Sequence, residues 1–268
     1  MTYVRRIAGN AVLLALAVLA LLPFLFMVIT SVQKTKTLSL AFDPSKFDLS
    51  GYVRLFTTFG FGNALITSVI VVVLACVVNA IVCSLAAFAF AKKPFPGSEK
   101  LYWVYIATLM VPGQVTLIPM FSIMRELGLL NTYVSLFLPV INAFGVFLIR
   151  QFMSNVPDEM LEAARIDGAS DRRIFWSLIL PAIRPVLVAL TVFTFLTTWN
   201  DFLWPLVSVT DDSMKTVTLA AAQLQGKFTS DFGLVMAGAT VSFVVPFVVY
   251  VVLQRQFVEG VTSSSVKG

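Results

Sequence analysis

The feature that most constrains this chain is a series of six apolar runs, each long enough to cross a lipid bilayer. A spanning helix needs roughly 20 mostly apolar residues. The composition agrees with this reading, because 58% of the residues are hydrophobic and 12% are charged, whereas a soluble domain carries about a quarter charged residues. We therefore expect an all-α integral membrane protein with six transmembrane helices. The runs cover approximately 8–32, 63–91, 101–123, 132–153, 183–208 and 233–255.

The same runs set the predicted domain organisation. We expect residues 1–62 to hold the first transmembrane helix and an outer segment, residues 63–256 to hold the other five helices and a cytoplasmic loop at 155–181, and residues 257–268 to form a cytoplasmic tail. Arg5 and Arg6 precede the first run as they would in a secretory signal. The apolar part of such a signal spans about 7–15 residues, so this longer run predicts an uncleaved first helix.

The distribution of positive charge predicts the orientation. With six helices, both termini lie on one side, and that side receives twelve of the 19 Lys and Arg residues. Arg5, Arg6, Lys92 and Lys93 cluster there close to helix ends. Cytoplasmic loops carry an excess of Lys and Arg, so both termini are expected in the cytoplasm. The net charge of +5 thus indicates orientation and gives no reason to expect nucleic-acid binding.

Residue types that support catalysis or metal binding are scarce. The chain has no histidine, which removes the commonest general base and metal ligand. Cys76 and Cys83 lie seven residues apart in the second run, too far apart along a helix for a disulfide, and are expected to face the bundle as small apolar residues. We predict neither catalytic residues nor a metal site.

The loop between the fourth and fifth runs predicts a compact helix–turn–helix. Pro157 suits the first position of a helix, and Gly168 suits the left-handed residue that ends it. Ser170 can cap a second helix, and Pro181 marks the next break. Ile174, Phe175, Leu178 and Ile179 then share one apolar stripe. Physical reasoning alone leaves two interpretations, a docking surface for another protein or an amphipathic hairpin at the membrane interface.

A specific motif in this loop resembles a known family. The spacing Glu-Ala-Ala-x-x-Asp-Gly-Ala, then Phe and Pro, matches the cytoplasmic coupling loop of binding-protein-dependent ABC importer permeases. Asn63, the stretch 110–119 and the segment 199–205 look like the sugar-importer branch, similar to the smaller six-span permease of maltose-type systems. The residues that carry the match are Glu162, Ala163, Ala164, Asp167, Gly168, Ala169, Phe175 and Pro181.

The resemblance implies a type I ABC importer permease in the bacterial inner membrane, forming half of a pore for a mono- or oligosaccharide. Its partners would be a second permease subunit, two ATPase subunits and an extracytoplasmic sugar-binding protein. Glu162 would form an ion pair with the ATPase, Ala163, Ala164 and Gly168 would permit close approach, and Asp167 would cap the turn. The chain has no Gly-x-x-x-x-Gly-Lys-Ser/Thr loop, so ATP and magnesium would be bound by the partner ATPases and the chain itself is not an enzyme.

Polar residues in the fifth run are candidates for the substrate path. Asn200 and Asp201 lie in an apolar stretch between Trp199 and Trp204. An aspartate within a membrane is costly and should face a partner or water. Aromatic faces and polar groups of this kind bind sugars, although Asp201 could equally make a structural contact with the companion permease.

Three further readings remain open. Pro112 and Gly113, followed by Pro119, interrupt the third run, either to line or flex the transport path or as a packing kink. The tail at 257–268 resembles the family's tail, which reaches the ATPase, but Ser264 and Ser265 stand where smaller Gly or Ala is usual, and a solvated tail is an equal alternative. On physics alone, a secondary transporter is the main competitor, ahead of a membrane-embedded enzyme or a scaffold; permeases for other solutes share the coupling loop.

Overall fold

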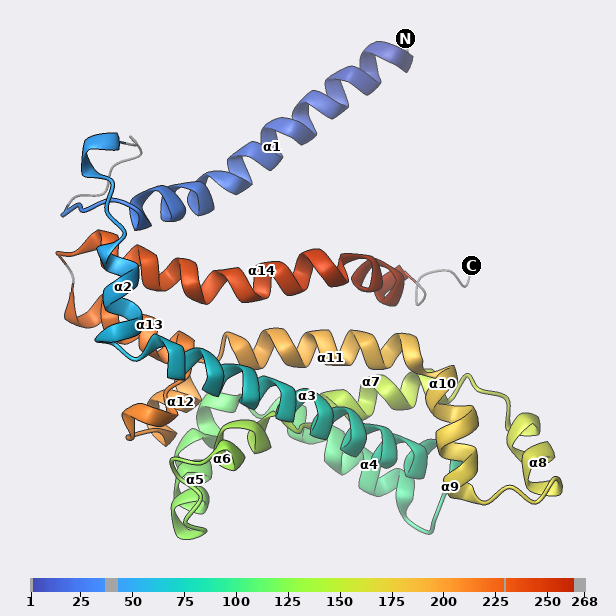
Figure 1. Ribbon diagram of the computed structural model, residues 1–268. Helices are drawn as coiled ribbons and strands as arrows, with labels where there is room; N and C mark the ends of the chain where they lie inside the picture. The colour runs from blue at the N-terminus through green and yellow to red at the C-terminus, as the bar shows by residue number, and fades with distance from the viewer. Residues whose placement is uncertain (1, 37–42, 229, 263–268) are drawn as a thin grey trace. The chain divides into compact units, whose positions relative to one another are not determined.

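The protein is almost entirely helical in the computed structural model, which describes residues 2–36, 43–228 and 230–262. Figure 1 shows the helices in chain order. Among these residues, pairing of the β type is limited to an isolated bridge between Gln33 and Phe47. The longer helices are α1 (Thr2–Ser31), α3 (Phe61–Lys92), α4 (Ser98–Ala107), α5 (Gly113–Glu126), α7 (Ala143–Met153), α8 (Asp158–Ile166), α11 (Arg184–Trp199), α13 (Val217–Lys227) and α14 (Phe232–Thr262).

Short helices join these elements. The α-helical ones are α2 (Ser50–Thr57), α6 (Tyr133–Phe137), α9 (Asp171–Ile174), α10 (Leu180–Ala182) and α12 (Leu203–Ser208). The 3₁₀ helices are η1 (Pro44–Lys46), η2 (Thr108–Met110), η3 (Leu138–Val140) and η5 (Asp212–Met214). The remaining short element, η4 (Phe175–Ile179), is a π-helical turn.

In the part of the chain that the structure describes, three single helices are long and apolar enough to cross a membrane, and up to six spans result if each bent helix pair counts as one. The single helices correspond to the first, second and sixth predicted runs. They comprise Gly9–Ser31, Phe61–Lys92 and Phe232–Gln254. The bent pairs are Ser98–Met110 with Gly113–Glu126 at 105°, Tyr133–Val140 with Ala143–Met153 at 47°, and Asp171–Ala182 with Arg184–Trp199 at 76°.

The interruption predicted in the third run is present as a sharp bend. The two helices on either side of Val111 and Pro112 meet at 105°, and Pro112 itself has an extended backbone (φ −59°, ψ 132°). A proline at this point cannot continue the hydrogen-bond ladder of the preceding helix. The prediction of a break at Pro112 and Gly113 is therefore confirmed, while its role in the transport path stays a prediction. Pro119 does not interrupt the run as expected, because it lies inside the continuous helix α5.

The fifth predicted run, 183–208, is divided in the structure. The helix α11 ends at Trp199, with Asn200 at its C-cap, and α12 begins only at Leu203. The carboxylate of Asp201 accepts a hydrogen bond from the backbone N–H of Trp204 at 3.3 Å. Side-chain acceptors compete with the helix for backbone donors, which explains why an apolar run this long does not form one helix.

The helices group into two compact units. The first comprises Met1–Leu65 and Val217–Val245. Within it, Phe24 stacks on Phe243 at a centroid distance of 4.6 Å, and Arg54 forms an ion pair with Asp231 at 2.8 Å. These contacts tie α1 to α14 and α2 to the residue that precedes α14.

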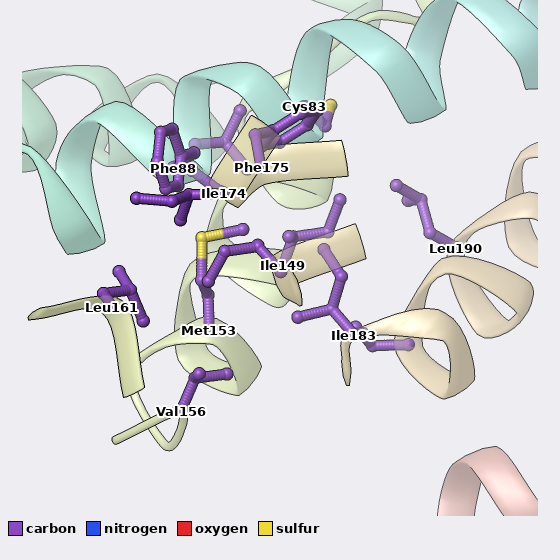
Figure 2. Packing of buried hydrophobic residues seen from close by; sticks show 14 residues of the cluster. Cys83, Phe88, Ile149, Met153, Val156, Leu161, Ile174, Phe175, Ile183 and Leu190 are labelled. Atoms are coloured by element: carbon purple, nitrogen blue, oxygen red, sulfur yellow. The ribbon is translucent and has the colours of Figure 1, made fainter. Parts of the chain in front are cut away.

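The second unit comprises Ile66–Thr216 and Pro246–Gly268 and contains the main hydrophobic core. Figure 2 shows this core, in which side chains from α3, α7, α8, the segment from α9 to α10, and α11 converge. Ile149 and Met153 of α7 are fully buried at its centre. The core therefore joins the two helices that flank the predicted cytoplasmic loop to the loop itself.

Candidate coupling site

The loop predicted to carry the function is a folded helical hairpin, defined here as residues 158–182 from α8 through α10. Its first helix begins at Asp158, one residue later than the sequence suggested, with Pro157 at the cap position. Asp158 and Glu159 lie in the first turn, where negative charge stabilises the positive end of the helix dipole.

The turn between the two helices closes with a regular hydrogen-bond pattern. Gly168 has a left-handed backbone with φ +80°. Its N–H donates to the carbonyl of Arg165 at 3.0 Å, and the N–H of Ala169 donates to the carbonyl of Ala164 at 2.9 Å. These two bonds define a Schellman motif, and Asp167 stands at the C-cap. The sequence prediction for the end of this helix is confirmed.

The second arm begins as predicted and contains an unpredicted π-helical turn. Ser170 caps α9, with its hydroxyl accepting from the N–H of Arg173 at 3.4 Å. The helical path then widens at Phe175–Ile179, two residues before Pro181, which lacks a backbone donor. The chain bends by 76° only after Ala182, so Pro181 lies within the final turn, just before the break. π-turns of this kind occur frequently at functional sites.

One face of the hairpin is anchored in the core. Leu161, Ile174 and Ile179 are 0–2% exposed, and Phe175 packs against Phe88 of α3 with ring centroids 5.4 Å apart. Figure 2 shows Leu161 and Ile174 directed toward Met153 and its neighbours. This packing makes the hairpin a rigid part of the second unit, which is what a docking element requires.

The opposite face of α8 is exposed and carries the predicted contact residues. Glu159, Glu162 and Ala163 are exposed, whereas Ala164 and Ala169 pack against the core. Ile166, at the last position of α8, is 87% exposed. Sequence reasoning did not single out this side chain.

Two lysines at the end of α3 also reach the hairpin. The ammonium of Lys92 lies 2.7 Å from a carboxylate oxygen of Asp158, and Lys93 forms an ion pair with Asp171. In the sequence these lysines served only as indicators of orientation. Their partners lie 66 and 78 residues away, so no local pattern could have revealed them.

The predicted substrate-path residues lie at the break between α11 and α12. Trp199 and Trp204 are 2% and 4% exposed; the first stacks on Phe195, and the second donates its indole N–H to the carbonyl of Ser135 at 2.7 Å. Asn200 is exposed and donates to the carbonyl of Leu196 at 2.8 Å. The structure thus places the two tryptophans within the packing and leaves Asn200 at the surface.

The remaining predictions concern the tail and metals. The helix α14 continues to Thr262, and Ser264 and Ser265 lie outside the described residues. Within residues 2–36, 43–228 and 230–262, no group of three or more His, Cys, Asp or Glu is arranged to hold a metal ion.

Apolar helices of membrane-spanning length and a folded helical hairpin with an exposed acidic face define the class of the protein, a multi-span membrane protein. Residues 80–263 match the family described as the binding-protein-dependent transport system inner membrane component. The chain belongs to this family and is a permease subunit of an ABC importer in the inner membrane. ATP hydrolysis in such systems is the task of separate subunits.

Curated relatives are similar over almost the whole chain. The arabinooligosaccharides transport system permease protein AraQ of Halalkalibacterium halodurans is 32% identical, over 94% of this chain and 93% of that protein. The lactose transport system permease protein LacG of Rhizobium radiobacter is 32% identical, over 98% of this chain and 99% of that protein. The similarity therefore extends beyond the coupling loop to all predicted spans.

Solved structures share the fold. A chain of a bacterial ABC transporter involved in the import of the acidic polysaccharide alginate superimposes with a TM-score of 0.81 at 25% identity, covering 94% of this chain and 97% of that chain. A chain from the alginate transporter in complex with its alginate pentasaccharide-bound periplasmic protein gives a TM-score of 0.67 at 13% identity, covering 96% and 97%. The second likeness supports the fold alone.

Proposed function

We propose that this chain forms half of the translocation pore of a sugar importer and couples transport to ATP hydrolysis through the helical hairpin. The observation that carries the proposal is the hairpin itself, buried on one face and presenting Glu162 and Ile166 on the other. The sugar assignment is supported by relatives named for arabinooligosaccharides and lactose. A permease for another class of solute is the second candidate, supported by a relative at 36% identity named for osmoprotective compounds.

The proposed complex contains this chain, a second permease subunit as a heterodimer, two ATPase subunits that bind ATP and magnesium, and an extracytoplasmic sugar-binding protein. In this arrangement each bent helix pair counts as one span. The six spans place both termini and the hairpin in the cytoplasm, beside the ATPases. Residues 1–62 supply the first span and an outer segment, residues 63–256 the core permease domain, and residues 257–268 the cytoplasmic tail.

Glu162 is proposed as the ion-pair residue toward the ATPase. It lies on the exposed side of α8 next to Ala163, whose small side chain permits close approach. A carboxylate whose charge is complemented at an interface contributes to both orientation and affinity. The buried residues Phe175 and Leu161 then hold this face in place.

Asn200 and Asp201 are proposed to face the substrate path at the break between α11 and α12. The break places polar side chains within an otherwise apolar region, and such breaks are tolerated where they line a cavity or meet protein. The neighbouring hydroxyl of Thr198 is buried and lacks a hydrogen-bond partner in the described part of the chain. Trp199 and Trp204 position this segment through their packing.

The docking role is tested by charge reversal at Glu162. In proteoliposomes containing the assembled importer, Glu162→Lys is expected to lower sugar uptake roughly tenfold or more, because an interfacial charge pair becomes a repulsion. Glu126→Lys at the exposed end of α5 is the matched control and should keep uptake near the wild-type level. Normal uptake by Glu162→Lys would contradict the docking role.

The path and the orientation are tested separately. Asp201→Asn should reduce uptake while all subunits still purify together, and unchanged uptake would remove Asp201 from the path. A single cysteine at the exposed Arg172, in a background with Cys76 and Cys83 replaced, should react with a membrane-impermeant maleimide only when the cytoplasmic face is accessible. Labelling of intact cells from outside would contradict the proposed topology.

A further inference from the structure

The end of α3 carries a buried ammonium group that is satisfied by the helical hairpin. The side chain of Lys92 is 3% exposed. Its Nζ donates to the carbonyl oxygen of Val156 at 2.6 Å and to Oδ1 of Asp158 at 2.7 Å. A buried charge is stable only when it is paired and hydrogen-bonded, so the start of α8 is held to the end of α3.

The next residue makes a second link to the other arm. Lys93 forms an ion pair with Asp171, the first residue of α9. The Nε of Arg165 lies 4.0 Å from the same carboxylate, which also joins the two arms to each other. Consecutive helical residues point about 100° apart, so Lys92 and Lys93 can reach the first residues of two different helices.

Apolar contacts on the same side of α3 complete the attachment. Phe88 lies four residues before Lys92 and so shares its helix face, and its ring packs on Phe175 at 5.4 Å. Cys83 and Ala87 of α3 are fully buried in the same core. The last turns of α3 and the helical hairpin therefore form one packed body, although they are distant in sequence.

The hairpin is joined covalently to its two neighbouring helices through a short linker and a sharp bend. It follows α7 through residues 154–157, and it joins α11 through the 76° bend after Ala182. A displaced hairpin can pivot at such a bend. By contrast, separation from α3 would break both hydrogen bonds of the Lys92 ammonium and the ring contact between Phe88 and Phe175.

We infer that Lys92 and Lys93 are positioning residues that fasten the helical hairpin to α3, so that a movement of the hairpin driven by the ATPase is passed to this spanning helix. The inference rests on the proposed docking function of the hairpin. It assigns a mechanical role to α3, which is not adjacent to the hairpin in the sequence. Loss of the fastening uncouples hydrolysis from transport without removing the docking surface.

Charge exchange at the exposed pair tests the inference in the assembled importer. The assay measures ATP hydrolysed per lactose or arabinotriose molecule taken up, using whichever sugar the wild-type complex transports. Lys93→Asp and Asp171→Lys are each expected to raise this ratio roughly threefold, the factor that an exposed ion pair of about 0.7 kcal/mol represents. The double variant should return the ratio to the wild-type value, and Lys100→Asp, at an exposed lysine on α4, should not change it.

The role of the buried Lys92 is tested by a distance measurement that does not depend on transport. Spin labels at positions 85 and 172 report the separation of α3 and the hairpin in nucleotide-free and ATP–vanadate-trapped complexes. The separation should stay constant in the wild-type sequence and should change between the two states in Lys92→Met. If Lys92→Met does not assemble, the Lys93–Asp171 exchange decides the question.

The outcomes distinguish this inference from the proposed function. A wild-type complex that takes up no mono- or oligosaccharide from a panel that includes lactose and arabinotriose contradicts the sugar assignment. A wild-type complex that transports, with single Lys93 and Asp171 variants that keep its ATP-to-sugar ratio, overturns the fastening role alone. Reduced assembly with an unchanged ratio would likewise show that the lysines stabilise the fold without transmitting motion.

Discussion

The guanidinium carbon of Arg150 lies 3.8 Å from the centroid of the Tyr102 ring, which joins the last turn of α7 to α4. The same side chain forms an ion pair with Glu99 at 2.9 Å. Tyr102 is 3% exposed, so the cation rests on a ring that is shielded from solvent. This contact holds α4, and with it the start of the bent third span, against the helix that leads into the hairpin.

A double-mutant cycle measures this contact. Arg150→Met and Tyr102→Leu each remove it, and we expect a coupling energy of about 1 kcal/mol because cation–π pairs contribute this much when partly desolvated. The measurement is the free energy of unfolding in mixed detergent micelles for the two single variants and the double variant. Additive effects of the two substitutions would show that the cation and the ring do not interact.

The packing of α7 against α3 leads to a second prediction. A Cβ at Gly145 would lie 2.6 Å from the Sγ of Cys83 and 3.3 Å from the Cδ1 of Leu190. Gly145→Ala is therefore expected to destabilise the protein by about 1–3 kcal/mol, the usual cost of overpacking a core. Thermal unfolding in detergent gives the measurement.

The same clash suggests a suppressor. Cys83→Ala removes the sulfur atom, so the double variant with Gly145→Ala should recover part of the lost stability even though Cys83→Ala alone opens a small cavity. Gly9→Ala, where nothing lies within 4 Å of the added Cβ, is the control for the change of residue type. A double variant less stable than Gly145→Ala would contradict the packing argument.

Acid is expected to loosen the segment that follows α1. The pKa of Asp43 is lowered from 3.8 to about 2, chiefly by the hydrogen bond from the Ser45 side chain and further by Lys46 and the Ser45 backbone. A carboxyl group with a lowered pKa stabilises the folded segment above its unfolded pKa and loses this contribution as the pH falls through the folded value. The turn at η1 should thus persist at pH 5 and open between about pH 4 and pH 2.

A spin label at the exposed Leu49 position reports this opening. Its mobility should be constant from neutral pH to about pH 4 and should rise at lower pH. In Asp43→Asn the carboxylate is absent, so the label should already be more mobile at neutral pH and respond less to acid. A label in Asp43→Asn that matches the wild-type profile would rule out this role for Asp43.

The sequence predicted those parts of the hairpin that depend on neighbouring residues. Gly168 ends α8 because glycine readily adopts the left-handed backbone conformation required there. Ser170 caps α9 because its hydroxyl reaches a backbone donor three residues on. Both signals lie within a few positions of the feature they specify. The apolar stripe through Ile174 and Ile179 was likewise readable from helical spacing alone.

Contacts between distant segments were not predictable in this way. Asn79 appears in the sequence as one polar residue in an apolar run, but its amide donates to the Thr194 hydroxyl at 2.9 Å, 115 residues away, and its oxygen accepts from Cys83 at 3.1 Å. Cys83, expected to be only a small apolar residue, is also a hydrogen-bond donor. Such pairs depend on which helices pack together, and local composition does not specify that.

Ile166 yields a prediction about the docking face. It is 87% exposed at the end of α8, whereas Leu161 on the same helix is 2% exposed in the core. If the ATPase covers Ile166, then Ile166→Ala should weaken binding of the ATPase subunit up to roughly tenfold, because burial of such a side chain contributes about 1.5–3 kcal/mol and alanine keeps part of it.

Two comparisons separate docking from folding. Ile123→Ala removes an apolar side chain that is 55% exposed on α5 and should not change ATPase binding. Leu161→Ala should lower the free energy of unfolding by about 2–5 kcal/mol, as expected for a truncated core leucine, whereas Ile166→Ala should leave it nearly unchanged. Binding is measured by titrating the ATPase subunit onto the permease pair in nanodiscs. Wild-type affinity for Ile166→Ala would mean that the contact is carried by the acidic residues of α8 without this side chain.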